Sequence, residues 1–220
     1  MRHALLASCL ALLTTPAFAA GVAISPTTLD AHVDVPAQAI ALHNRGDAPL
    51  RYQVRAYHWS QANGVDVLSE ANDVLATPAI VEVPAQGRRV VRLMRLRGVG
   101  TIGYYRVFVH QLPAAAGDAP VGSNVSLLVH HSIPMAFEPN KKDVSLSVGT
   151  EVDGYRLHNA GTAAARVTRL GPAGGTPWRE GALGWVLPGT SKTIPLESKD
   201  RSASVSVTVN GAAQTLTVEP

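Results

Sequence analysis

Apolar and more polar residues alternate with a period of two along most of this chain, and that pattern constrains its fold more than any other feature. Within the segment 50–59, for example, Tyr52, Val54 and Ala56 occupy alternate positions. Successive side chains of a β-strand point to opposite faces of a sheet, so this alternation predicts strands with one buried face. No segment shows a convincing 3.6-residue apolar repeat of the kind that predicts an amphipathic helix. The sequence is therefore predicted to fold as an all-β protein.

The alternating segments are short and are separated by turn residues. Strands are predicted at residues 38–42, 50–59, 79–83, 88–96, 104–112, 124–137, 144–148, 154–159, 165–170, 192–196, 202–209 and 212–218. The last two form the clearest hairpin, because Asn210-Gly211 supplies the positive φ angles of a type I′ turn. Many short strands at this spacing predict immunoglobulin-like β-sandwiches.

A polar, proline-containing boundary divides the chain into two predicted domains. It runs from Glu138 to Lys142, and the strands predicted after it are shorter than those before it. We therefore expect an N-terminal immunoglobulin-like domain at residues 20–138, a linker at 139–142 and a smaller C-terminal immunoglobulin-like domain at 143–220.

The first 19 residues are predicted to be a secretory signal peptide. A short basic start precedes the apolar run 4–13, and Ala17-Phe18-Ala19 matches the A-x-A cleavage pattern, so cleavage is expected after Ala19. The alternative, a lipidation box ending at Cys9, is disfavoured because only five residues precede it and the apolar run continues past the cysteine. Cys9 is the only cysteine, so the mature chain should have no disulfide and no thiolate site. No later apolar run approaches the roughly 18 residues that a membrane helix needs, so no membrane insertion is expected.

Composition and motifs disfavour several classes of function. A formal net charge of +3 in 220 residues is too small to indicate nucleic-acid binding. The sequence has no G-x-S-x-G, H-E-x-x-H or phosphate-binding glycine loop, and its carboxylates are scattered rather than paired as in a glycosidase. We therefore expect no enzyme activity and no cofactor.

Two short motifs have weaker functional interpretations. The adjacent His130 and His131 suggest a metal site, but neighbours on a strand point to opposite faces and cannot readily chelate one ion. No further ligand stands at a recognisable spacing, so no metal is expected. Arg45-Gly46-Asp47 matches a cell-adhesion tripeptide, but its place between two strands predicts a turn.

The longest alternating segment, 124–137, differs from the others in what surrounds it. It follows a Pro/Ala-rich loop at 113–120 and leads towards the domain boundary. One of its faces is nearly all apolar and carries Val125, Leu127, Val129, His131, Ile133, Met135 and Phe137. Residues 133–137 are expected to be a core strand. An apolar strand with an unpaired edge is an aggregation hazard, but it can also capture another chain by strand addition.

The mature chain resembles the periplasmic pilus-assembly chaperones of the chaperone–usher pathway, especially their archaic branch. The resemblance rests on an ordered set of segments: 22–27, an element at Pro78, 90–93, 105–108, the Pro/Ala-rich loop, 132–139 and 157–161. It implies two immunoglobulin-like sandwiches at an angle, with a cleft between them. It also implies a periplasmic protein that stabilises pilus subunits by donor-strand complementation and delivers them to an outer-membrane usher.

The resemblance also implies which residues bind the subunit. Val125, Leu127 and Val129 match the alternating apolar residues that the chaperone inserts into the subunit. Members of the family anchor the subunit's C-terminal carboxylate with an Arg and a Lys, but the matching positions here hold Thr28 and Pro134.

A carboxylate in a cleft still requires a cationic donor. We expect Arg106 and Arg156 to fill that role, with Arg92 and His131 as reserves.

Two other functions remain open at this stage. The chain could be a secreted structural or adhesive surface component. A pilus subunit, however, would lack its final strand and carry an N-terminal donor extension, and this chain shows neither sign. A histidine metal-binding protein is the second alternative.

Overall fold

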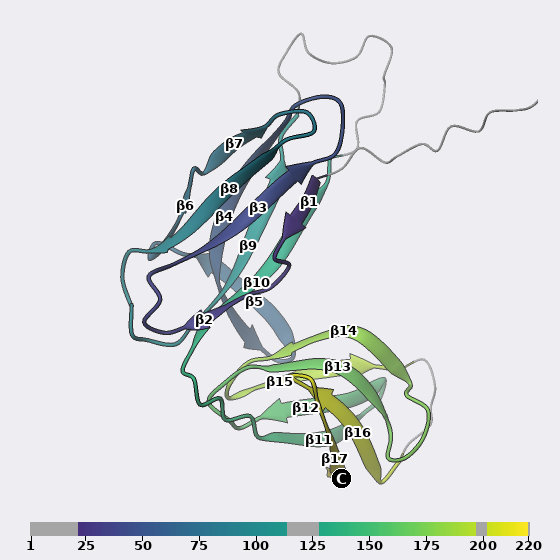
Figure 1. The fold of residues 1–220 in the computed structure, drawn as a ribbon. Helices are drawn as coiled ribbons and strands as arrows, with labels where there is room; N and C mark the ends of the chain where they lie inside the picture. The colour runs from purple at the N-terminus through teal and green to yellow at the C-terminus, as the bar shows by residue number, and fades with distance from the viewer. Residues whose placement is uncertain (1–21, 114–127, 197–201, 220) are drawn as a thin grey trace, which may run out of the picture.

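The structure is a computed structural model, and it describes residues 22–113, 128–196 and 202–219. The described residues form two lobes, an upper one in Figure 1 up to residue 138 and a lower one from residue 146. None of these residues lies in a helix. The strands run steeply in the upper lobe, whereas most strands of the lower lobe run nearly across the view, so the two lobes lie at an angle.

Ten described strands build the upper lobe. They are β1 (Val22–Ser25), β2 (Leu29–His32), β3 (Ala37–Asn44), β4 (Leu50–Ala62), β5 (Val65–Glu70), β6 (Val74–Thr77), β7 (Ile80–Val83), β8 (Arg88–Arg95), β9 (Gly103–Gln111) and β10 (His130–Glu138). One sheet has the order β1-β3-β8-β6, and the facing sheet has the order β2-β10-β9-β4-β5, with β7 also pairing with β4. The inward side chains of both sheets pack together, among them the fully buried Leu42, Leu93 and Val107. This arrangement is a β-sandwich.

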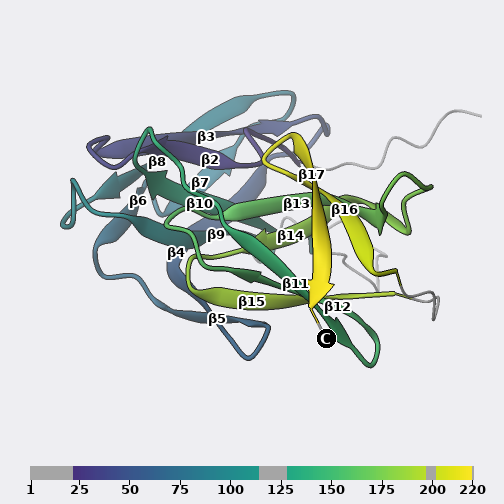
Figure 2. The same cartoon turned by 90° about the horizontal axis from the view of Figure 1, so that it is seen from below.

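Seven described strands build the lower lobe. They are β11 (Leu146–Glu151), β12 (Gly154–Asn159), β13 (Ala165–Pro172), β14 (Arg179–Val186), β15 (Thr190–Pro195), β16 (Ser204–Val209) and β17 (Ala212–Glu219). Their order is β14-β13-β16-β17-β11-β12-β15. Figure 2, which looks from the lower lobe, shows β17 passing beside β11, and a short parallel pairing joins these two strands at Val148↔Val218. The strands enclose a second core that includes Tyr155, Leu157 and Val207. The prediction of an all-β fold with two sandwiches is therefore confirmed.

Most predicted strands are present, with some differences. Asn210 and Gly211 have φ angles of 51° and 85°, as the predicted hairpin requires. The strands β1, β2, β5, β6 and β14 were not predicted. The long strand predicted at 124–137 begins at His130 in the described residues, and residues 124–127 lie outside them. Val129 is not part of the strand, because its N–H donates to the Gln111 side chain at 3.2 Å instead of joining the regular ladder.

Candidate functional site

The β10 strand has one edge that is only partly covered. It pairs with β9 along residues 130–137, but it pairs with β2 only along residues 135–138. Among the described strands, residues 130–134 therefore have a neighbour on one side only. Within the described residues, the main-chain groups on the other side of this segment have no strand partner and can pair with an added strand, except that Pro134 has no N–H to donate.

The side chains of β10 divide between two environments. Ile133, Met135 and Phe137 are buried in the core of the upper lobe, as expected for residues 133–137. Val129, which precedes the strand, is half-buried and exchanges hydrogen bonds of 3.2 Å with Gln111. The other two predicted capture residues, Val125 and Leu127, lie outside the described residues.

The predicted anchor Arg106 lies on β9, directly opposite Pro134 of β10. Its Nη2 lies 3.1 Å from Asp66 Oδ2. Its guanidinium carbon lies 3.9 Å from the ring centre of Trp59, which is a cation–π distance. These contacts with Asp66 and Trp59 therefore hold Arg106 in place, on the face of the sheet that leads to the lower lobe.

Asp66 has three kinds of stabilising partner. Burial alone would raise the pKa of its carboxyl, but the Gln61 amide, the nearby Trp59 indole and the charges of Lys192 and Arg106 lower this pKa below the ordinary value of 3.8. The Gln61 amide donates to Asp66 Oδ1 at 2.8 Å. Trp59 Nε1 is buried but forms no hydrogen bond of good geometry, so we attribute its effect to proximity. Asp66 is therefore a stably ionised carboxylate.

Arg156, the second predicted anchor, lies on β12 of the lower lobe. Its Nε lies 3.3 Å from Glu151 Oε1, and 56% of its side chain is exposed. It lines a pocket of about 460 Å³ together with Gln61 of the upper lobe and Thr190 of the lower lobe. The structure thus brings both predicted anchors close to Gln61, where the lobes meet, and each is already paired with a carboxylate.

The reserve residues lie elsewhere. Arg92 is exposed on β8, in the sheet that does not contain β10. His131 lies on the same face of β10 as the core residue Ile133, and its Nε2 is buried without a hydrogen-bond partner. Neither is placed at the junction of the lobes. Thr28, at one of the family's usual anchor positions, is half-buried immediately before β2.

The Gln61 side chain links the two lobes by hydrogen bonds. Its Nε2 donates to the Trp185 carbonyl at 2.8 Å, and its Oε1 accepts from Leu187 N at 2.9 Å and from Thr190 Oγ1 at 2.8 Å. An apolar cluster packs beside it and consists of Trp59, Tyr104, Ala136, Ala164, Trp185 and Leu187. Sequence reasoning missed Gln61, Asp66 and Lys192. The Asn63-Gly64 turn next to them was the signal that could have placed Gln61 and Asp66 on one hairpin.

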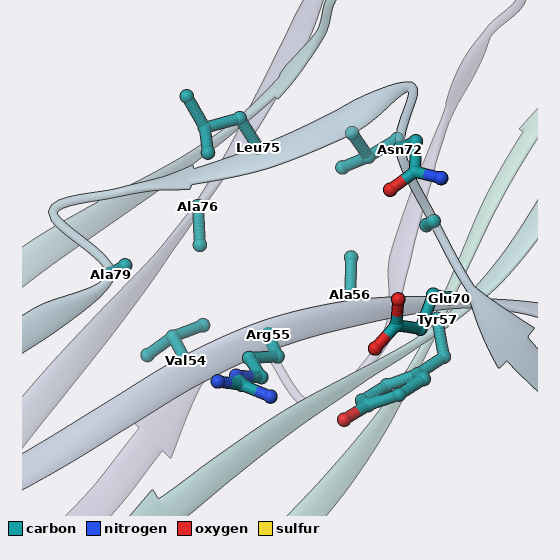
Figure 3. A pocket seen from close by; sticks show the side chains of 11 residues that line it. Val54, Arg55, Ala56, Tyr57, Glu70, Asn72, Leu75, Ala76 and Ala79 are labelled. Atoms are coloured by element: carbon teal, nitrogen blue, oxygen red, sulfur yellow. The ribbon is translucent and has the colours of Figure 1, made fainter.

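A separate hollow of about 330 Å³ opens on the upper lobe between β4 and β6. Figure 3 shows Ala76 of β6 pointing towards Val54 and Ala56 of β4, while Arg55 points the other way. The lining is a mixture of small apolar and polar groups without a cluster of reactive side chains.

The described residues contain neither a metal-binding cluster nor a membrane-spanning helix. No group of three or more His, Cys, Asp or Glu side chains is arranged to hold a metal ion. No helix there has the length and apolar character needed to cross a membrane.

Solved structures share this fold. One is a complex of CsuC and CsuE, the chaperone–tip adhesion subunit pre-assembly complex from archaic chaperone–usher Csu pili of Acinetobacter baumannii. It has 20% identity and a TM-score of 0.71, covering 91% of this chain and 100% of that one. The Salmonella enterica SafA pilin–SafB chaperone complex has 14% identity and a TM-score of 0.67, covering 90% and 96%. The Pseudomonas aeruginosa CupB2 chaperone has 13% identity and a TM-score of 0.61, covering 90% and 100%.

Sequence comparison gives the family. No relative was found among the curated proteins. Residues 21–143 match the model of the pili and flagellar-assembly chaperone, PapD N-terminal domain, which is more than half of the chain. The matched region contains β1–β10, with both the open edge of β10 and Arg106. The chain therefore belongs to the family of pilus-assembly chaperones.

Proposed function

We propose that this chaperone binds pilus subunits by donor-strand complementation along β10 and the residues before it. The observation that supports this most is the edge of β10 at residues 130–134, which lacks a second neighbour among the described strands. A subunit strand could pair with that edge through its main chain, and the preceding apolar residues could fill the subunit's incomplete core.

The proposed capture residues are Val125, Leu127 and Val129. Burying one such side chain contributes about 1.5–3 kcal/mol, so three contribute roughly 5–9 kcal/mol before the cost of ordering both chains. That magnitude is enough to keep a subunit from aggregating, yet it leaves the strand replaceable by a strand of the next subunit.

The subunit's C-terminal carboxylate is proposed to bind Arg106, Arg156 or both. Arg106 supports this role because it lies opposite Pro134, where other members of the family carry a Lys. Arg156 supports it because it lines a pocket to which both lobes contribute.

Export and delivery complete the proposal. The mature protein is proposed to begin at Ala20 in the periplasm and to pass its subunit to an outer-membrane usher. N-terminal sequencing of the exported protein tests the first point. Transfer of subunit from the purified complex to detergent-solubilised usher tests the second.

Co-expression with candidate subunits, the secreted proteins encoded beside the chaperone, tests capture. Changing Val125, Leu127 and Val129 together to Asp should abolish subunit co-purification, because three charges cannot enter an apolar groove. The matched control changes Leu75, Val90 and Met94 to Asp, since these residues are also apolar but lie exposed on the other sheet. Capture that survives the first triple change as well as it survives the control would show that the proposal is wrong.

A further inference from the structure

The carboxylate of Asp66 lies between an amide donor and a guanidinium where the lobes meet. One oxygen accepts from Gln61 Nε2 at 2.8 Å, and the other lies 3.1 Å from Arg106 Nη2. Asp66 stands directly opposite Gln61 in the β4–β5 hairpin, so the hairpin register fixes its position. This carboxylate is only 32% exposed, which makes it less hydrated than an ordinary surface acid.

The groups around Asp66 come from both lobes. Arg106 is oriented by its contact with Trp59, and Lys192 contributes positive charge from β15 of the lower lobe. Gly184 makes room for Lys192, because a Cβ at Gly184 would lie 2.6 Å from Lys192 Cε. Two cations therefore act on the Asp66 carboxylate, which lies on an exposed strand, and its surroundings favour an anion.

The same site is connected to the contact between the lobes. The Gln61 amide that donates to Asp66 also donates to the Trp185 carbonyl at 2.8 Å. A group that replaced Asp66 would therefore face the Gln61 amide donor, whose position is determined by contacts in both lobes.

We propose that Asp66 is an internal substitute for the carboxylate of a bound subunit. Arg106, Gln61 and Lys192 form a carboxylate-binding site, and the subunit's C-terminal carboxylate enters it by displacing Asp66. This proposal rests on the proposed function and on Arg106 as an anchor. Exchanging one carboxylate for another keeps the cations neutralised before and after binding, so the anchor stays reversible.

Acetate is the probe that tests the site without any subunit. The indole Nε1–H signal of Trp59, assigned with Trp59→Phe, is followed by NMR while sodium acetate replaces sodium chloride at constant ionic strength. Asp66→Asn should give a saturable shift, because the competing carboxylate is gone. The wild-type protein should bind acetate more weakly than Asp66→Asn, since acetate must first displace the tethered Asp66 carboxylate.

Two further variants make the acetate test specific. Asp66→Asn combined with Arg106→Gln should lose the shift. Asp34→Asn removes an exposed carboxylate elsewhere and should behave as the wild type does. If Asp66→Asn perturbs the fold, Asp66→Ser provides the same test. A folded Asp66 variant with no saturable shift, or a wild-type protein with equal acetate affinity, overturns the proposal.

Subunit capture tests the link to the proposed function. Asp66→Asn should strengthen subunit binding, and Arg106→Gln should weaken it. Changes in the same direction would overturn the role of Asp66, while loss of capture in the triple Asp variant would still support donor-strand complementation. If the triple variant instead retains capture, the proposed function fails, and the acetate result still reports on the anion site alone.

Discussion

Asp30 and Glu138 place two carboxylates at the junction of the lobes, and their partners explain why they are tolerated there. Glu138 accepts hydrogen bonds from Tyr104 Oη at 2.8 Å and from the Ala164 N–H of the lower lobe at 2.7 Å. Its second oxygen lies 2.8 Å from Lys142 Nζ, which also contacts Asp30 at 2.8 Å. A buried carboxylate with this many donors is stabilised, because hydrogen bonds and a paired cation compensate for its lost hydration.

The Asp30 carboxyl makes stability depend on pH. Burial would raise its pKa, but hydrogen bonds and charge from Lys142 and Arg166 outweigh burial and lower the pKa from 3.8. A carboxyl with a lowered pKa in the folded state stabilises the fold above its unfolded pKa and loses that contribution as pH falls through the folded pKa. We expect the wild type to exceed Asp30→Asn in free energy of unfolding at pH 7. This difference should shrink from about pH 5 downwards.

Urea unfolding of both proteins between pH 7 and pH 3 measures that difference. Asp34→Asn serves as the charge-matched control, since 72% of the Asp34 side chain is exposed. A gap between the wild type and Asp30→Asn that stays constant over the whole pH range would contradict the prediction.

At the scale of elements, two Asn-Gly hairpins form the same turn in different surroundings. Gly64 has a φ of 79° and Gly211 a φ of 85°, a region that disfavours residues with a Cβ. A Cβ at Gly64 would meet only Thr193, at 3.7 Å, and at Gly211 it would meet nothing within 4 Å. Each Gly→Ala change should therefore cost only backbone strain, about 1–2 kcal/mol in urea unfolding. A loss well above 3 kcal/mol at Gly64 alone would show that this turn supports the contact between the lobes.

These hairpins also show what the sequence could and could not predict. The C-terminal hairpin was predicted because Asn210-Gly211 stands between two segments of alternating residues, and its first strand alternates in burial in the structure. The same Asn-Gly signal before β5 was missed, because β5 is short and every one of its residues is exposed, so it presents no buried apolar face. The core half of β10 was predictable for the opposite reason, since Ile133, Met135 and Phe137 share one buried face.

The candidate site was only partly predictable, because its contacts join distant parts of the chain. Arg106 could be selected as a cation on a strand next to the proposed capture segment. Its pairing with Asp66 depends on the register of β4 with β5 and with β9. The bond from Gln61 to Trp185 spans 124 positions and depends on how the lobes pack, which no local pattern encodes.

For the molecule as a whole, Gln61 should limit how far the lobes move relative to each other. Gln61→Ala leaves the Leu187 N–H and the Trp185 carbonyl without their partner, and it removes the only side chain described here that bonds to both groups. The contacts of the apolar cluster remain, so the lobes should stay associated but occupy a wider range of orientations. We expect a broader distribution of distances between the lobes in this variant.

Spin labels on the two lobes can measure this distribution by pulsed electron resonance. Residues 20–220 contain no cysteine, so cysteines placed at the exposed Glu82 and Thr217 would be the only labelling sites. Gln53→Ala is the matched control, because Gln53 lies on the same strand but stands opposite Ile80 and His110, which both belong to the upper lobe. If Gln61→Ala and Gln53→Ala both keep the wild-type distribution, the remaining contacts between the lobes, among them the apolar cluster and the Glu138–Ala164 hydrogen bond, are enough to fix their angle.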